Sequence, residues 1–118
     1  MNKYNARRTK IDGITFDSLA ESRRYGELKL MQASGDIGDL KVHPRFVVWQ
    51  GYDKRTGKVE KITYIGDFEY YELWSKVVGA HVVEDVKGVE TDVFKIKAKL
   101  FRCQYPDLEL RIVKMNER

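Results

Sequence analysis

The sequence predicts an α/β protein, a sandwich in which a mixed central β-sheet is flanked by helices. Residues 18–34 and 91–104 carry apolar residues at helical spacing, and the segments between and after them are rich in β-branched and aromatic residues. A chain of 118 residues, 42% hydrophobic and 34% charged, has the composition of one globular domain with a modest core. No repeat or Pro/Ser-rich linker interrupts it. We therefore predict a single domain over residues 1–118, with residues 1–10 as a basic N-terminal tail.

Two helices are predicted from their capping residues. Ser18 and Glu21 have the spacing of a capping box, so a helix is expected over residues 18–34, ending at Gly35. Thr91 is a suitable N-cap for a second helix, which should run to about Gln104 before Tyr105-Pro106 ends it.

Strands are predicted on four segments: residues 42–49, 59–73 with a potential break at Gly66, 81–87, and 108–113 as an edge strand. Asp12-Gly13 adds a tight hairpin ahead of the first helix. The order is therefore helix, three strands mostly in hairpin relation, helix and strand, which is an α-β-β-β-α-β core.

Charge and composition narrow the class of protein. The net charge is +4, and basic residues gather near the two ends of the chain, at Arg7, Arg8 and Lys10 and at Lys95, Lys97, Lys99 and Arg102. Basic ends around a more acidic middle suit a protein that contacts phosphates and holds a divalent metal. No apolar run has the length of a membrane span and no secretory signal is seen, so we expect a cytoplasmic protein without membrane contact.

Cysteine and histidine contribute little to the prediction. Cys103 is the single cysteine, which excludes an internal disulfide and argues against a zinc cluster; it is interpreted as an ordinary helix residue. His43 and His81 lie far apart, and neither has a second nitrogen or sulfur ligand at metal spacing. Histidine-based catalysis is therefore not expected.

The segment that carries chemistry is Glu84-Asp85-Val86-Lys87. Side chains alternate along a strand, so Asp85 and Lys87 share one face while Glu84 and Val86 share the other. If the preceding strand pairs with this one as a hairpin, Asp67 lies beside Asp85. Two converging carboxylates repel each other unless a cation holds them, and Mg²⁺ is the cation that prefers oxygen ligands.

We therefore predict a magnesium site made by Asp67, Asp85 and the backbone carbonyl of Val86, with Mn²⁺ expected to substitute. Lys87 would orient or deprotonate an attacking water and offset charge on a phosphate. The alternative is a surface salt bridge, which is the usual role of an isolated Asp-x-Lys.

Two helix positions are candidates for the same site. Glu21 falls on the helical face of Tyr25 and Leu28, so it either completes the capping box, faces the sheet as a further metal ligand, or does both. In the second helix, Lys97 falls within the apolar arc formed by Val93, Phe94, Ala98, Leu100 and Phe101. A lysine in such a place either extends to solvent or reaches into a site, and we favour a phosphate contact. The aromatic residues Tyr64, Tyr70, Tyr71 and Trp74 are interpreted as core or edge-strand residues, with stacking on an unpaired base as the alternative.

The order of these motifs resembles a family of small phage and prophage proteins that is known as a domain of unknown function and is placed among the PD-(D/E)XK nucleases. The resemblance covers nearly the whole chain. It rests on Glu21 after Phe16-Asp17-Ser18, on Tyr64-Ile65-Gly66-Asp67-Phe68, on Glu84-Asp85-Val86-Lys87-Gly88, and on Thr91, Phe94, Lys97, Lys99-Leu100-Phe101 and Tyr105-Pro106. It implies a restriction-endonuclease-like fold. The wider superfamily includes Holliday junction resolvases, mismatch-nicking enzymes and restriction endonucleases.

Carried over residue by residue, the resemblance implies that Glu21 is the helix acid, Asp67 the first strand acid, and Asp85 with Lys87 the D-x-K pair. Gly66 stands where the proline of the family name would be. His43 stands before Pro44, where glutamine is expected, so the resemblance assigns this side chain no role.

The expected function is a magnesium-dependent DNA endonuclease that selects DNA structure, including branched DNA, and works as a homodimer. The dimer is implied by the resemblance to resolvases alone. Arg7, Arg8, Lys10, Lys95, Lys97 and Lys99 are the candidate DNA contacts. The alternatives are a non-catalytic DNA-binding or assembly protein that retains the nuclease fold, and a nuclease directed at RNA.

Overall fold

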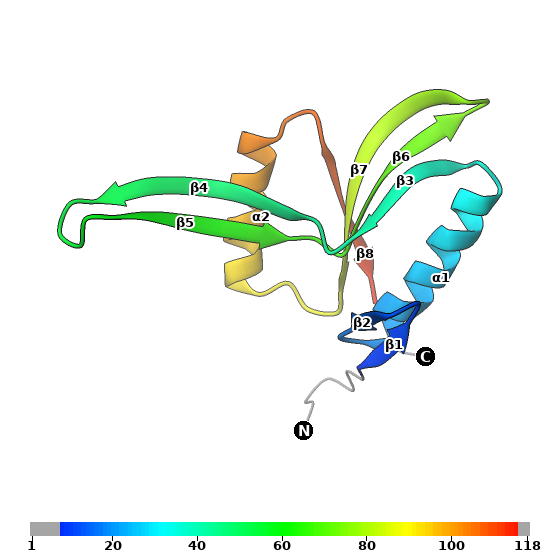
Figure 1. Cartoon of the computed structure of the whole chain (residues 1–118), viewed down its shortest axis with the longest axis horizontal. Coiled ribbons are helices and arrows are strands. Elements are labelled where there is room, and N and C mark those ends of the chain that lie inside the picture. The colour runs from blue at the N-terminus through cyan, green and yellow to red at the C-terminus, as the bar shows by residue number, and fades with distance from the viewer. Residues whose placement is uncertain (1–7, 116–118) are drawn as a thin grey trace.

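The computed structural model describes residues 8–115, in which there are one mixed four-stranded sheet, two helices and two further two-stranded hairpins. The elements in chain order are β1 (Thr9–Ile11), β2 (Ile14–Phe16), α1 (Leu19–Ala33), β3 (Ile37–Val42), β4 (Arg45–Asp53), β5 (Lys58–Ile65), β6 (Phe68–Trp74), β7 (Val77–Lys87), α2 (Asp92–Gln104) and β8 (Glu109–Lys114). Figure 1 shows β3, β6, β7 and β8 converging at one end, near the start of α1.

The main sheet has the strand order β3-β6-β7-β8. The first two pairings are antiparallel, and the β7–β8 pairing is parallel because α2 carries the chain back between those strands. The sheet is therefore mixed, and β8 is an edge strand, as predicted. The main sheet and its helices run α1, β3, β6, β7, α2, β8, but the first strand of this order is β3 and not the predicted strand at residues 42–49.

One helix covers each face of this sheet. Val82 and Val86 of β7 belong to the core under α1, together with Tyr25 and Leu28. Val83, which follows Val82, belongs to a second core with the α2 residues Phe94, Ala98 and Phe101. Alternation along β7 thus assigns Glu84 to the α1 face and Asp85 with Lys87 to the α2 face, which confirms the predicted strand parity.

The predicted helices and the Asp12-Gly13 hairpin are confirmed. Ser18 and Thr91 are the two N-caps, and each accepts a hydrogen bond from the backbone N–H three residues later, at 3.1 Å in both cases. Within α2 one expectation is wrong. Val93 is 62% exposed, because the buried stripe is the narrower set Phe94, Ala98 and Phe101.

The prediction of a strand at residues 42–49 merged two separate elements. β3 ends at Val42, and β4 begins at Arg45 in a different sheet. β3 was missed because Gly38 and Asp39 resemble a loop, and the ladder with β6 is in fact irregular between Gly38 and Lys41. The predicted break at Gly66 is confirmed, since it separates β5 from β6.

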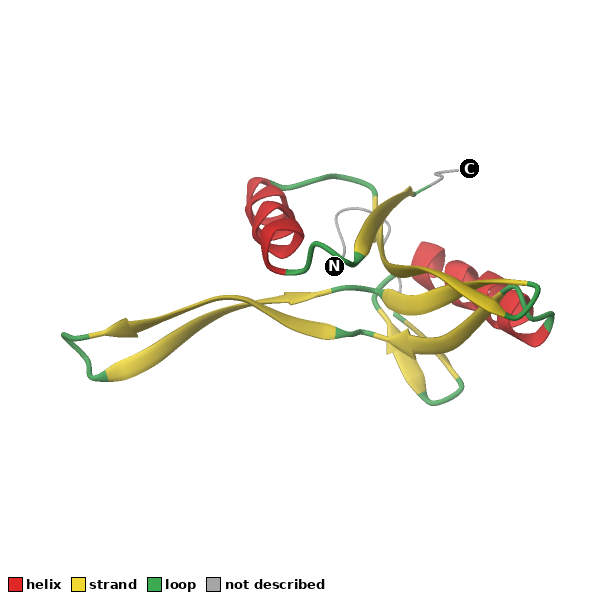
Figure 2. Cartoon of the chain, turned by 90° about the horizontal axis from the view of Figure 1, so that it is seen from above, coloured by secondary structure: helices red, strands yellow, loops and turns green. Residues whose placement is uncertain are grey.

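β4 and β5 form a two-stranded hairpin, residues 45–65, which we call the arm. Figures 1 and 2 show the arm leaving the convergence point of the sheet and projecting well beyond the body. Accordingly the radius of gyration is 16.1 Å, above the roughly 13–14 Å of a compact domain of this length. Only the root of the arm packs on α2, where Phe46 lies against Phe101. The hydroxyl of Tyr105, the residue after α2, donates to the Val47 carbonyl at 3.0 Å.

Neither helix of residues 8–115 is long and apolar enough to span a membrane. Cys103 is free and exposed on α2, as expected of a cysteine without a partner.

Candidate metal centre

Asp67 lies at the end of the sheet where β6 begins, beside the last residues of β7. Its backbone N–H donates to the carbonyl of Glu84 at 2.9 Å, and its Oδ2 accepts from the Val86 N–H at 2.6 Å. The β6–β7 hairpin therefore brings Asp67 next to Asp85, as predicted. This contact is made by the Val86 N–H, and the predicted role of the Val86 carbonyl as a metal ligand stays a prediction.

Gly66 is required for this arrangement. A Cβ built at Gly66 would lie 2.8 Å from Val83 Cγ1, closer than packed atoms allow. The Gly66 N–H also donates to the carbonyl of Pro44 at 3.0 Å, and a proline has no N–H to make this bond. The local structure therefore favours glycine over proline at position 66.

Asp85 and Lys87 point together to the α2 face. Lys87 Nζ lies 3.3 Å from Asp85 Oδ1 and 4.4 Å from the centre of the Phe94 ring. The Tyr64 hydroxyl donates to the other oxygen of Asp85. Asp85 is 3% exposed, so this is not the surface salt bridge of the alternative interpretation. The hydrogen bond from Tyr64 was missed, since the sequence indicated only a core aromatic.

Glu21 lies at the start of α1 and is half-buried. Its backbone N–H is bonded to the Ser18 cap, and the charges of Asp85 and Lys87 both act on its carboxylate. The position predicted for it, on the face of α1 that meets the sheet, is therefore confirmed.

A buried ion pair fixes α1 to the sheet one turn beyond Glu21. Arg24 Nε and Nη2 donate to the two oxygens of Glu84 at 2.8 and 2.7 Å. The Tyr70 hydroxyl donates to the same carboxylate, which is 1% exposed. Glu84 is thus a structural acid on the α1 face, whereas its neighbour Asp85 faces the site.

His43 joins the cluster, which the sequence did not indicate. One possible ligand atom each from Glu21, His43 and Asp67 lie within 4.8 Å of one another. The backbone N–H of His43 donates to the backbone carbonyl of Asp67 at 2.9 Å. His43 has a φ of +55° at the turn from β3 into the arm. Because the whole arm separates His43 from Asp67 along the chain, no local spacing could have revealed this contact. We call Glu21, His43, Asp67, Asp85 and Lys87 the candidate metal centre.

The electrostatics of the candidate metal centre favour a bound cation. Burial raises the pKa of Glu21, and the nearby charges of Asp17 and then Asp85 add to this effect. Burial, followed by the charges of Glu21 and Asp85, raises the pKa of Asp67 to about 8. Carboxyls held this close together bind either protons or a positive ion at neutral pH. The oxygen donors suit Mg²⁺ or Mn²⁺, and the His43 imidazole adds a donor that suits Mn²⁺ better than Mg²⁺.

The predicted DNA contacts are spread over two elements. Arg7 lies outside the described residues. Lys10 in β1 and Arg8 just before it are exposed beside the start of α1, and Arg8 Nε lies 3.9 Å from Asp17 Oδ1. Lys95 and Lys99 are exposed on α2, and Lys97 is half-buried there. No ion pair within residues 8–115 joins these five cations to the candidate metal centre.

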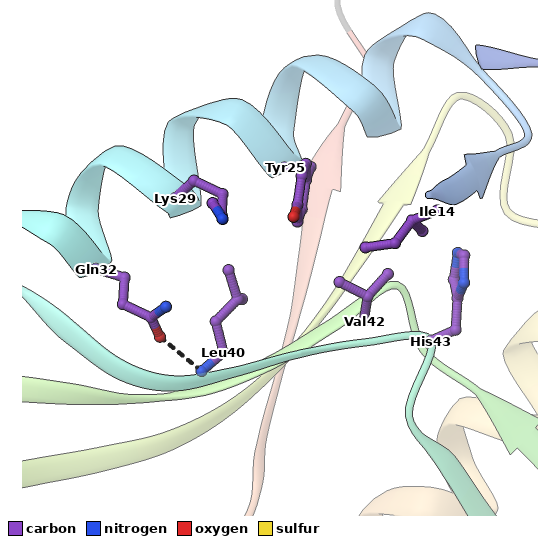
Figure 3. A pocket seen from close by; sticks show the side chains of 7 residues that line it. All are labelled: Ile14, Tyr25, Lys29, Gln32, Leu40, Val42 and His43. Carbon is purple, nitrogen blue, oxygen red and sulfur yellow. Dashed lines mark hydrogen bonds between the residues drawn. The ribbon is translucent and has the colours of Figure 1, made fainter. Parts of the chain in front are cut away.

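A shallow cleft of about 490 Å³ opens beside the candidate metal centre. Ile14, Leu40 and Val42 give it apolar walls, and His43 lies at the end opposite Gln32 and Lys29 (Figure 3). The Gln32 side chain is already engaged, because it accepts from the Leu40 N–H at 2.8 Å.

Comparison with known proteins assigns the chain to one family, whose function is unknown. Neither the curated proteins nor the solved structures contain a match to this chain. One family model matches residues 1–117. The chain therefore belongs to the family described as "Protein of unknown function (DUF1064)".

Proposed function

We propose that this chain is a magnesium-dependent endonuclease that hydrolyses phosphodiester bonds in DNA, with a restriction-endonuclease-like fold of the PD-(D/E)XK type. The observation that carries the proposal is the meeting of Glu21, Asp67 and Asp85 with Lys87 at one end of the sheet. The exposed tripeptide Asp39-Leu40-Lys41 also contains an Asp-x-Lys ion pair, at 3.7 Å, but Glu69, the acid paired with Lys41 across the sheet, is bonded to His81. The Asp85–Lys87 pair differs from the Asp39–Lys41 pair because Glu21 and Asp67 lie close to it. The Asp-x-Lys tripeptide alone does not distinguish the two pairs.

The residues have separate roles in this proposal. Glu21, Asp67 and Asp85 hold the metal, with the Val86 carbonyl and the His43 imidazole as further donors. A bound Mg²⁺ supplies a Lewis acid for a phosphate oxygen and lowers the pKa of an attacking water.

Lys87 is held at the candidate metal centre by Asp85 and by the face of Phe94. Its ammonium group orients the attacking water and offsets the charge that develops on the phosphate. Tyr64 fixes the other Asp85 oxygen, so that the carboxylate keeps a single orientation.

The test is cleavage of a four-way junction, a linear duplex, a single strand and an RNA duplex, each with and without Mg²⁺. We expect magnesium-dependent cutting of DNA, strongest on the four-way junction. Asp85→Asn and Lys87→Ala should each reduce cutting by at least about a hundredfold and leave DNA binding in place. The matched control is Asp39→Asn with Lys41→Ala, which removes the exposed pair and should cut normally.

Absence of metal-dependent cutting on every substrate would refute the enzyme. Salt-sensitive DNA binding that Mg²⁺ leaves unchanged would instead support a non-catalytic DNA-binding protein with the same fold.

We also propose that the enzyme acts as a homodimer, so that two strands are cut together. Light scattering at the concentration used for cleavage tests this point.

A further inference from the structure

The arm has one face that carries cations and apolar side chains but no acid. Cross-strand partners share a face, so one face is made of the pairs Arg45–Ile65, Val47–Thr63, Gln50–Lys61 and Tyr52–Val59. Both acids of the arm, Asp53 and Glu60, belong to the opposite face, which continues the side that packs on α2. We call the acid-free side the outer face.

The outer face is unpartnered within the described chain. Tyr52 is 64% and Val59 56% exposed, and no hydrogen bond or ion pair joins residues 50–61 to any described residue outside the arm. An isolated two-stranded ribbon is only marginally stable in water. Apolar side chains displayed on such a ribbon indicate that it acquires a partner.

The charge of the arm indicates the chemistry of that partner. Lys54, Arg55 and Lys58 at the tip add to Arg45 and Lys61 of the outer face, and Asp53 is the acid engaged locally by Arg55. A second copy of the chain that packs its own outer face against this one would bring like charges together, which costs free energy. A polyanion is the complementary partner.

The root of the arm connects it to the candidate metal centre. β4 begins two residues after His43, and β5 ends two residues before Asp67. The bonds from Gly66 N–H to Pro44 and from His43 N–H to Asp67 close this root. A nucleic acid whose phosphate lies at the candidate metal centre therefore has the arm beside its flanking segment.

We propose that the arm docks in a groove of duplex DNA, with its outer face toward the bases and its cations on the flanking phosphates. The major groove admits a two-stranded ribbon, and thymine methyl groups accept apolar contacts. The nine residues of β4 span about 30 Å, which corresponds to roughly nine base pairs of duplex on one side of the cut. The position of the cut rests on the function proposed above, whereas duplex binding by the arm does not.

The experiment measures binding of a labelled 24-base-pair duplex by anisotropy in EDTA, so that cleavage plays no part. In the first variant an Asn-Gly turn replaces residues 50–61, joining the cross-strand partners Trp49 and Ile62. The second is Lys61→Glu on the outer face. Its matched control is Lys76→Glu, the same charge change at the exposed turn of the β6–β7 hairpin.

The shortened arm should weaken duplex binding by at least tenfold. Lys61→Glu should weaken binding by about fivefold or more in 0.1 M salt and lower the slope of log Kd against log salt by about one. Lys76→Glu should change neither quantity. An RNA duplex should bind at least tenfold more weakly, since its major groove is too deep and narrow for a ribbon.

Unchanged duplex binding by Lys61→Glu overturns the proposal, as does equal binding of the RNA duplex. The proposal is also overturned if the shortened arm binds DNA normally but converts a dimer to a monomer, because the arm is then an interface between copies. If the shortened variant does not fold, Lys61→Glu decides, because its side chain makes no ion pair within residues 8–115. Duplex binding through the arm without magnesium-dependent cutting would refute the nuclease and keep this proposal. Magnesium-dependent cutting that is unaffected by the arm variants would keep the nuclease and refute the proposal for the arm.

Discussion

Asp67→Asn tests whether the candidate metal centre is under electrostatic strain without its metal. The pKa of Asp67 is raised from 3.8 to about 8 by burial and by the charges of Glu21 and Asp85. The folded protein therefore binds this proton more tightly than the unfolded chain. The resulting stability is complete below about pH 4 and is lost as the pH rises through about 8.

The magnitude follows from this interval of about four pH units. At about 1.4 kcal/mol per unit, the ceiling is between 5 and 6 kcal/mol. Water reaches part of the Asp67 side chain and Glu21 shares the proton, so we expect about half of that, 2 to 3 kcal/mol. Asparagine removes the charge and still offers an oxygen to the Val86 N–H. It should therefore stabilise the metal-free protein at pH 8.5 and raise its Tm by about 10 °C.

Thermal unfolding monitored by circular dichroism measures this effect, in EDTA at pH 5.0 and 8.5 and again with 10 mM Mg²⁺. Wild-type protein should lose stability between pH 5.0 and 8.5 in EDTA and regain it with Mg²⁺, whereas Asp67→Asn should respond weakly to both changes. The exposed residue Asp107 provides the matched control, Asp107→Asn. If Asp67→Asn lowers the Tm at pH 8.5 in EDTA, or if metal-free wild-type protein gains stability with rising pH, our electrostatic account of the centre is wrong.

Three further substitutions test the parts that position the candidate metal centre. Arg24→Ala leaves the buried carboxylate of Glu84 without its cation and should lower the free energy of unfolding by about 3 to 5 kcal/mol, measured by urea denaturation. Gly66→Ala forces a Cβ to within 2.8 Å of Val83 and should cost about 1 to 3 kcal/mol in the same assay. His43→Gln replaces a nitrogen donor, so calorimetric titration should show a fall of about tenfold in Mn²⁺ affinity and a smaller change for Mg²⁺.

Each of these substitutions has a matched control on the same chain. Arg23→Ala removes an exposed neighbour of Arg24, and Gly26→Ala places a Cβ on α1 where nothing lies within 4 Å. His81→Gln changes a histidine that is bonded to Glu69 and is not part of the candidate metal centre. Stability losses in the controls that equal those of the test variants would contradict the roles assigned to Arg24 and Gly66. An unchanged preference between Mn²⁺ and Mg²⁺ in His43→Gln would exclude the imidazole as a ligand.

The sequence by itself determined the features that depend on local periodicity. The caps at Ser18 and Thr91 were predicted because a helix start requires an oxygen three residues before a free N–H. The shared face of Asp85 and Lys87 followed from the two-residue repeat of a strand, and the face of Glu21 followed from helical phase. These relations hold within one element and need no knowledge of its neighbours.

Only the tertiary structure decided which elements meet. β3 and β4 follow each other closely in the chain but belong to different sheets. One strand was therefore predicted at residues 42–49, where a turn at His43 in fact separates two strands. The same turn brings His43 to Asp67 across the arm, and the pairing of Arg24 with Glu84 depends on how α1 lies on β7. Such contacts join residues that are distant in the chain, and their positions are set by strand register and by helix packing, which local spacing does not encode.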